Sequence, residues 1–235
     1  MRWSAHAGGS SPYTISPALF ERVGWANGEA LGRDLNIVLN VHHYDELNDA
    51  PSGQRPRFLG LWRQIAARYA GWPGRLCLEL LNEPRAAMTA GAWNELIPLA
   101  LAVVRDRDPG RAVIVGPARV NDIGALPELE LPDDDRLVVT VHYYAPLEFT
   151  RQGAPWRAGA GQWLGTTWGD DADRRAASDD LARAARLELV LLGLRHRLRR
   201  VRPGARRLAR ATARRAPRRR KTAGRLTAVF PRPSS

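Results

Sequence analysis

The chain has 235 residues, of which 44% are hydrophobic and 7% aromatic, and its formal net charge is +12. This composition excludes an intrinsically disordered chain, and the single cysteine, Cys77, excludes an internal disulfide. The longest apolar runs, LIPLALAVV and LELVLLGL, are too short to cross a bilayer, so we expect a globular domain without membrane association.

The positive charge is confined to the C-terminal segment. Residues 1–185 hold 19 Lys+Arg against 23 Asp+Glu, whereas residues 186–235 hold 17 against one acid, Glu188. All tryptophans and tyrosines also precede residue 186. We therefore divide the chain into a slightly acidic domain over residues 1–185 and an Arg/Ala/Pro-rich basic tail over residues 186–235.

Two hypotheses account for the basic tail. Its charge would suit a disordered arm for nucleic acid or another polyanion, but it has no interleaved aromatic residues and no recognisable binding fold. Alternatively, the coding frame changes near residue 186. Arginine outnumbers lysine 35 to one over the chain, as expected of a GC-rich gene, and such DNA read out of frame yields Arg-, Ala- and Pro-rich peptide. We favour the frame change and expect no nucleic-acid partner.

Apolar, β-branched segments alternate with amphipathic ones along residues 1–185. Ser16 and Pro17 are typical of a helix start, Gly71 of a helix end, and Pro98 predicts a kink or a late boundary within a helix. The nearly continuous apolar runs predict strands of a buried parallel sheet, and hence an α/β fold. The predicted helices cover residues 16–34, 55–71 and 89–110, and the predicted strands cover residues 35–44, 75–83, 111–117 and 136–144.

Polar side chains gather where three of the four predicted strands end. Groups contributed by the carboxyl ends of several parallel strands are typical of a (β/α)8 TIM barrel. Such a barrel takes about 250 residues. We therefore expect an incomplete barrel, with the central strands present and the first and last strands missing or altered. The polar residues at the strand ends are His42, His43, Asn82, Glu83, His142, Tyr143 and Tyr144.

Glu83 is the candidate catalytic carboxylate. It stands in the segment ELLNEP, directly after an apolar strand and next to Asn82. By itself a glutamate here could simply cap the following helix or pair with an arginine. At the mouth of a barrel, however, the carboxyl group could protonate a glycosidic oxygen while the Asn82 amide binds a neighbouring hydroxyl.

The histidine motifs VHHY and VHYY suggest substrate contacts rather than a metal site. If the strand continues through His42 and His43, their side chains point to opposite faces, and no Cys or HExxH partner is present. We therefore expect no metal. His142 and Tyr144 are two residues apart and fall on one side of a strand, where they could bind substrate or orient a carboxylate. Alternatively, Tyr144 packs at the rim.

Three tryptophans lie in the Gly-rich segment APWRAGAGQWLGTTWGD that follows the His142 strand. Their aromatic faces could stack on sugar rings, or they could pack the loop onto the barrel. The sequence leaves both interpretations open.

The segments LNIVLNVHHYDEL, LCLELLNEP and LVVTVHYYAPLEFTRQGAPW together resemble glycoside hydrolase family 5, the cellulase-type retaining β-glycosidases with a TIM barrel. The resemblance covers residues 1–185. It implies that Glu83 is the proton donor (acid/base) and that His42, Asn82, His142 and Tyr144 contact substrate or orient catalytic groups. It further implies a β-linked polysaccharide or oligosaccharide substrate and no cofactor, and we expect a monomer.

The sequence has no match for the second carboxylate of that family. The resemblance calls for a nucleophilic glutamate in a segment like Gly-Glu-Phe-Gly on a later strand, and no such segment occurs. A retaining mechanism requires two carboxyl groups about 5–5.5 Å apart. We assign none of the acids after residue 170 this role; they are Asp171, Asp173, Asp179, Asp180 and Glu188.

From the resemblance we therefore expect a retaining hydrolase of O-glycosidic bonds in β-glucan-type polysaccharides or oligosaccharides. We expect its activity to be impaired, because the nucleophilic glutamate is missing. Two alternatives stay open: an inactive barrel fragment, and a basic polyanion-binding protein that acts through residues 186–235. Family members that attack polysaccharides are commonly secreted. No signal peptide is visible at the N-terminus, so the sequence leaves the compartment open.

Overall fold

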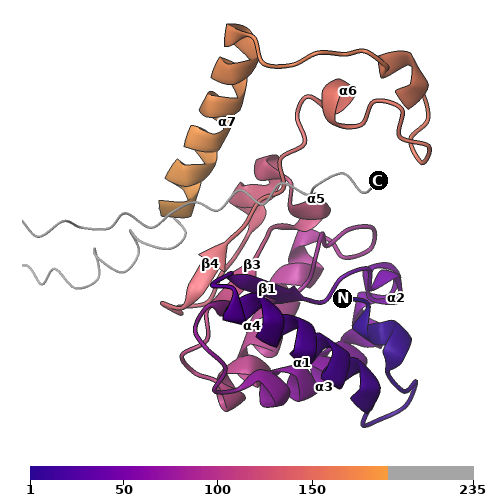
Figure 1. Ribbon diagram of the computed structural model, residues 1–235, viewed down its shortest axis with the longest axis vertical. Coiled ribbons are helices and arrows are strands. Elements are labelled where there is room, and N and C mark those ends of the chain that lie inside the picture. Colours follow the sequence, from indigo (N-terminus) through magenta and orange to yellow (C-terminus); the bar gives the residue numbers. More distant parts are fainter. Residues whose placement is uncertain (190–235) are drawn as a thin grey trace, which may run out of the picture.

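The computed structural model describes residues 1–189, and their side chains up to residue 186 (Figure 1). From residue 190 on, the predicted basic tail lies outside the described residues, so both hypotheses about it stay predictions. No helix within residues 1–189 is long and apolar enough to cross a membrane.

Four short parallel strands form one sheet within the described residues, in the spatial order β1-β2-β3-β4. Spatial order follows sequence order, so each strand is joined to its neighbour by a crossover, as a parallel sheet requires. The predicted α/β fold with a parallel sheet is confirmed. The strands are β1 (Ile37–Asn40), β2 (Leu76–Glu79), β3 (Val113–Val115) and β4 (Leu137–Val139).

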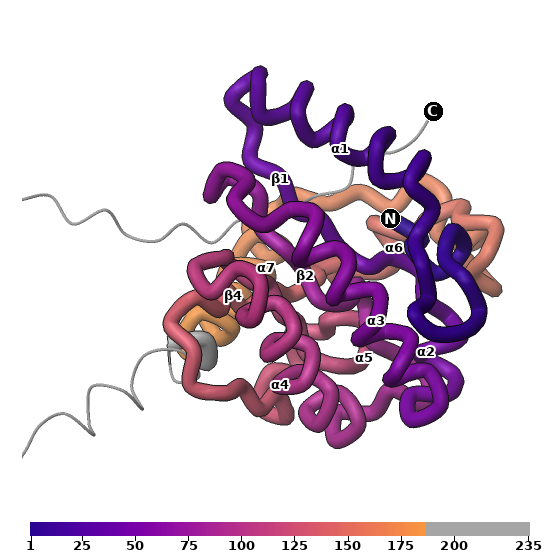
Figure 2. The backbone as a smooth tube through the Cα atoms, turned by 90° about the horizontal axis from the view of Figure 1, so that it is seen from below, coloured from indigo at the N-terminus to yellow at the C-terminus, as the bar shows by residue number. Residues whose placement is uncertain are grey.

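Long helices pack on one face of this sheet. Figure 2 shows α3 and α4 side by side, with α1 next to the β1 edge. The helices on this face are α1 (Pro17–Gly32), α3 (Pro51–Tyr69) and α4 (Ala90–Arg107). A further long helix, α7 (Asp171–Leu189), lies apart from them. The short elements are η1 (Trp3–His6), α2 (Asp45–Asp49), α5 (Ala118–Asn121), η2 (Ile123–Glu128), α6 (Leu147–Thr150) and η3 (Ala160–Trp163).

The structure changes one predicted helix start and decides between the two alternatives at Pro98. Helix α4 runs through Pro98 to Arg107, within the predicted range 89–110, so the boundary at Pro98, one of the two alternatives, does not occur. Proline removes only one helical hydrogen bond, and the apolar residues on both sides of it, such as Ile97 and Leu101, stay buried in the core. Helix α3 begins at Pro51 rather than residue 55, because proline at the first helical position is pre-organised for a start.

The core lies between the sheet and helices α3 and α4. Trp62 of α3 and Trp93 of α4 are fully buried, and each donates its indole N–H to a backbone carbonyl just beyond a strand, at Leu80 (3.1 Å) and Gly116 (2.9 Å). Burying an aromatic side chain stabilises a fold by about 1.5–3 kcal/mol relative to leaving it exposed. These helices therefore hold the segments that follow β2 and β3 in place.

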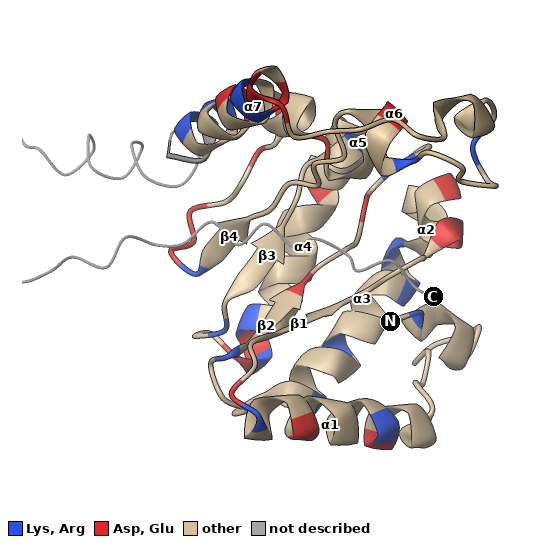
Figure 3. Cartoon of the chain, turned by 45° about the horizontal axis from the view of Figure 1, so that its top comes forward, with Lys and Arg blue, Asp and Glu red and all other residues tan. Residues whose placement is uncertain are grey.

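Helix α7 differs from the core helices in its polarity. Figure 3 shows acidic and basic residues along α7, whereas α4 carries few. Its Ala184 is buried, and α7 packs against η2. The polar stretch after residue 170 is thus a surface helix that contacts the rest of the domain through few residues.

Candidate active site

The residues predicted to act together lie just beyond the carboxyl ends of β1, β2 and β4. Glu83 follows β2, and the His142 and Tyr144 side chains reach it from the segment after β4. The Asn82 N–H donates to the Val41 carbonyl at 2.9 Å and so ties the segment after β2 to the one after β1. Parallel strands bring these segments to one edge of the sheet.

The Glu83 carboxyl group is held by two donors at the same oxygen. His142 Nδ1 lies 2.7 Å from Glu83 Oε1, and the Tyr144 hydroxyl lies 3.5 Å from it. Glu83 has φ of 51°, in the left-handed region that a non-glycine residue seldom adopts. Its side chain is 23% exposed. The carboxyl group is therefore oriented by the protein and still open to a ligand.

Two arginines add positive charge around Glu83. Arg85 donates to the Glu83 carbonyl at 3.3 Å and pairs with Asp45, and the Arg151 guanidinium lies 4.5 Å from the Tyr144 ring centroid. Burial raises the pKa of Glu83, but the His142 hydrogen bond and the charges of Arg151 and Arg85 outweigh it, so its pKa lies below the ordinary value. The ligand-free site thus favours a carboxylate.

Tyr144 serves as a hydrogen-bond donor at this site. Burial, together with the negative charge of Glu83, raises the pKa of the Tyr144 phenol. The phenol therefore stays protonated and can donate to the carboxylate. The His142 and Tyr144 rings meet edge to face with centroids 6.2 Å apart, so the predicted same-side placement of this pair is what the structure shows.

His42 lies near this group, but its relation to His43 differs from the expectation. Strand β1 ends at Asn40, and His43 has φ of 52°, so the two rings do not point to opposite faces. They meet edge to face with centroids 4.0 Å apart. Burial, with the charges of His43 and the amino group of Met1, lowers the pKa of His42 to about 4. At neutral pH its imidazole is therefore uncharged.

Asn82 is buried beside Glu83, and its predicted contact with substrate stays a prediction. Within residues 1–189 the structure contains no group of three or more His, Cys, Asp and Glu side chains placed to hold a metal ion.

Sequence reasoning missed two polar residues of this region. Glu79, the last residue of β2, is buried and accepts from Asn40 Nδ2 at 2.9 Å, and burial raises its pKa. A charged residue inside the apolar segment LCLELL is a visible signal for it. Asn121 lies with its Nδ2 3.3 Å from His142 Nε2. No local motif marks Asn121, because its position depends on an unusual turn.

The three tryptophans of the loop after β4 have different surroundings. Trp156 is 75% exposed, whereas Trp163 lies under the Arg157 guanidinium, 5.2 Å from its ring centroid. Trp168 packs on Phe149 with centroids 6.1 Å apart, and both are partly exposed. Loop packing thus accounts for Trp163, and stacking on a ligand stays a prediction for the other two.

The sheet gathers a carboxyl group, an imidazole and a phenol at its carboxyl edge, and these are groups that acid–base chemistry uses. The chain belongs to the family Cellulase (glycosyl hydrolase family 5), whose sequence profile matches residues 1–187. The predicted family is confirmed.

This chain is also similar to known proteins in both sequence and structure. Endoglucanase H of Acetivibrio thermocellus is 33% identical over 173 residues, which make up 74% of this chain and 18% of that protein. Thermotoga maritima Cel5A, an endoglucanase solved with mannotriose and with cellobiose, matches at a TM-score of 0.77 and 41% identity over 80% of this chain. Cellulose synthase subunit Z of Clostridioides difficile matches 80% of this chain at a TM-score of 0.75 and 31% identity.

The chain spans only part of these relatives. It covers 61% of the Thermotoga maritima chain and 62% of the Clostridioides difficile chain. The match supports the predicted TIM-barrel class over the described strands.

Proposed function

We propose that the chain acts on β-linked glucans, with Glu83 as the proton donor to the glycosidic oxygen. The observation that carries this proposal is the placement of the Glu83 carboxyl group at the carboxyl edge of the sheet. One of its oxygens, Oε1, accepts hydrogen bonds from both His142 and Tyr144. The family and the endoglucanase names of the relatives support the substrate class.

The proposed chemistry uses Glu83 twice. As a carboxylic acid it gives its proton to the leaving glycosidic oxygen. The bond from that oxygen to the anomeric carbon breaks, and the anomeric carbon would bond to a second carboxylate. As a carboxylate Glu83 then takes a proton from the water that attacks the anomeric carbon and releases that second carboxylate. His142 and Tyr144 would donate to the carboxylate between the two steps. Because the neighbouring positive charges lower the pKa of Glu83, nearby negative charge is needed to keep its proton in place.

No described acid is assigned as the nucleophile. Asp180 of α7 accepts from the Tyr143 hydroxyl at 2.9 Å, and Asp173 accepts from the Gly169 N–H at 2.8 Å, so both carboxylates are engaged elsewhere. The side chain of Glu188 lies outside the described side chains.

The test is turnover of cellotetraose by the full chain and by Glu83→Gln. General acid–base catalysis contributes about 10²–10⁴-fold, so we expect kcat to fall by that factor in the variant. Glu95→Gln, at an exposed position on α4, is the matched control and should keep the parent rate. Equal rates in the parent and Glu83→Gln would refute the acid/base role.

A second substrate separates proton donation from other losses. A dinitrophenyl β-cellobioside has a leaving group that needs little protonation, so bond cleavage in Glu83→Gln should be largely spared. The readout is release of the leaving group in the first turnover, because the later attack of water also uses Glu83. A first-turnover loss of the same size on both substrates would show that Glu83 acts otherwise than as the acid.

Glucan binding without turnover is the second candidate function, because none of the described acidic side chains is assigned as the nucleophile, whereas Trp156, which could stack on a sugar ring, is 75% exposed. Calorimetric titration of the full chain with cellotetraose tests it. Saturable heat without product would favour this candidate, and detectable product would favour hydrolysis.

A further inference from the structure

Asn121 is the polar residue of this region that the proposed chemistry leaves unused. It is fully buried, and it makes two polar contacts with His142. Its side-chain Nδ2 lies 3.3 Å from His142 Nε2, and its backbone carbonyl accepts from the His142 N–H at 2.9 Å. Asn121 therefore lies behind His142, on the side of the ring that faces away from Glu83.

The backbone that carries Asn121 is strained. Arg119, Val120 and Asn121 are three consecutive non-glycine residues with φ of 58°, 60° and 58°. Left-handed backbone costs about 1–2 kcal/mol per residue for non-glycine residues. Such conformations persist only where surrounding contacts over-determine them, and they gather at functional sites.

Two hydrogen bonds fix this left-handed turn between the halves of the candidate site. The Val120 N–H donates to the carbonyl of Pro84, the residue after Glu83, at 2.9 Å. The Asn121 carbonyl accepts from His142 at the other end. The turn thus joins the segment that carries Glu83 to the segment that carries His142.

A glycine makes room for the Asn121 side chain. A Cβ atom at Gly116 would lie 2.5 Å from both Cγ and Oδ1 of Asn121, closer than atoms can approach. The absence of a side chain at residue 116 therefore lets the amide lie against the backbone. Asn121 Oδ1 is buried without a hydrogen-bond partner among the described residues, so the His142 contact is made at the expense of an unsatisfied oxygen.

The contact at Nε2 couples the orientation of the Asn121 amide to the protons that His142 carries. A neutral imidazole has one N–H donor and one acceptor nitrogen. When Asn121 Nδ2 donates, Nε2 must be the acceptor, so the proton lies on Nδ1 and is donated to Glu83 Oε1 across 2.7 Å. The opposite amide orientation would place Oδ1 at Nε2 and favour an imidazolium with both nitrogens protonated.

We propose that Asn121 is a positioning residue that holds His142 as the neutral Nδ1–H tautomer, so that Glu83 receives a hydrogen bond without a full positive charge beside it. The consequence for catalysis rests on the proposed function. An imidazolium at His142 would favour the Glu83 carboxylate and oppose its role as proton donor. The titratable groups that face or influence His142 are Glu83, Tyr144, His42 and Glu79.

The direct test is ¹⁵N NMR of the histidine rings in the labelled full chain at pH 7. The His142 signals are identified by their loss in His142→Gln. We expect an unprotonated Nε2 and a protonated Nδ1 in the parent. In Asn121→Asp the carboxylate accepts from Nε2–H, so Nε2 becomes protonated. In Asn121→Ala the donor is lost, and the single tautomer with it.

Two further variants keep the test independent of folding defects. Gly116→Ala retains Asn121 but displaces its amide, so it should also remove the single tautomer. Asn27→Asp, at a buried asparagine on α1, is the matched control and should keep the parent His142 spectrum. A protonated Nε2 in the parent would overturn the proposal. So would a parent spectrum retained in Asn121→Asp, Asn121→Ala and Gly116→Ala.

Kinetics provide the second readout. With cellotetraose, Asn121→Asp should lower kcat by about tenfold or more with little change in KM, while the dinitrophenyl substrate is largely spared. The NMR result needs no turnover. Failure of hydrolysis in the parent would therefore refute the proposed function and leave the tautomer measurement to decide the role of Asn121.

Discussion

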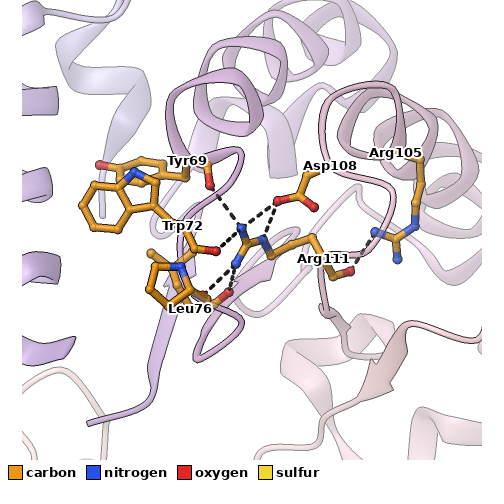
Figure 4. A network of polar contacts seen from close by, with 7 residues as sticks. Tyr69, Trp72, Leu76, Arg105, Asp108 and Arg111 are labelled. Atoms are coloured by element: carbon orange, nitrogen blue, oxygen red, sulfur yellow. Dashed lines mark hydrogen bonds and ion pairs between the residues drawn. The ribbon is translucent and has the colours of Figure 1, made fainter. Parts of the chain in front are cut away.

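Two polar clusters lie at opposite ends of the same parallel sheet, and they are built differently. At the amino end, Arg111 precedes β3 with its side chain 3% exposed. Figure 4 shows its guanidinium bonded to Asp108 and to backbone carbonyls. At the carboxyl end, the Glu83 side chain is 23% exposed, and both of its described carboxyl contacts are on Oε1.

The contrast lies in how completely each charged group is satisfied. All three guanidinium nitrogens of Arg111 donate: Nε to Asp108, and the terminal nitrogens to Asp108 and four backbone carbonyls. Those carbonyls belong to Tyr69, Trp72, Pro73 and Leu76. A saturated cluster at the amino end of a parallel sheet fixes structure, whereas partly open groups at the carboxyl end are available to a ligand. Mutations at the two ends should therefore affect different properties.

The largest expected effect on stability is at Arg111. Arg111→Leu removes every donor and leaves Asp108 and four carbonyls without this partner in a buried site. Breaking a buried ion pair from one side costs about 3–5 kcal/mol, so the free energy of unfolding in urea should fall by that amount. Arg33→Leu, which breaks an exposed pair with Glu29, should cost less than about 1 kcal/mol. Equal losses in the two variants would contradict the structural role of Arg111.

The sequence predicts the strands and helices that build both clusters better than it predicts the clusters themselves. The apolar runs around Leu39, Leu78 and Val139 are periodic signals of local origin, so their strands were expected, although with longer bounds. Strands end early where the chain turns, as at His43 and Glu83, whose left-handed backbone no local pattern announces.

Within the candidate site, the sequence predicts the residues that match the family motifs but does not predict the residues that hold them in place. Glu83, His142 and Tyr144 were expected to act together because each follows a strand. Asn121 and Arg151 were not, because their positions depend on contacts between distant segments. The Arg111 network was missed for the same reason, since its partners are mostly backbone carbonyls that any sequence supplies.

The second expected effect is a pH dependence of stability that originates at the carboxyl end. Because the pKa of His42 is about 4 when folded, against an ordinary value of 6.5, the unfolded chain binds this proton at a higher pH than the folded one. Stability should therefore be complete above pH 6.5 and fall as the pH drops toward 4. Allowing for solvent screening of this half-buried ring, the loss is on the order of 1–2 kcal/mol.

Urea unfolding of His42→Gln between pH 7 and pH 4 measures this contribution. Between pH 7 and pH 4 the free energy of unfolding should fall less in His42→Gln than in the parent. In His6→Gln, at an exposed position, it should fall as much as in the parent. A parent stability that rises on acidification over this interval would contradict the sign.

A smaller effect on stability is expected at Glu83 itself. Glu83→Gln keeps an oxygen that can accept from His142 and Tyr144, and it removes a charge from a partly exposed site. We expect the free energy of unfolding to change by less than about 1 kcal/mol, far less than at Arg111. Thermal unfolding followed by circular dichroism checks it. A loss comparable to that of Arg111→Leu would show that the carboxyl end is as structural as the amino end.

The smallest expected effect is a gain in stability, at Val120 in the left-handed turn. Val120 is 40% exposed and has φ of 60°, so its β-branched side chain adds strain without filling the core. Val120→Gly relieves about 1–2 kcal/mol of strain and costs about 0.5–1 kcal/mol of chain entropy. The net gain should be about 0.5 kcal/mol in urea unfolding. Val103→Gly, a partly buried residue within helix α4, is the matched control and should lose stability. A clear loss of stability in Val120→Gly would show that the turn is held by its side chain rather than by the Pro84 and His142 hydrogen bonds.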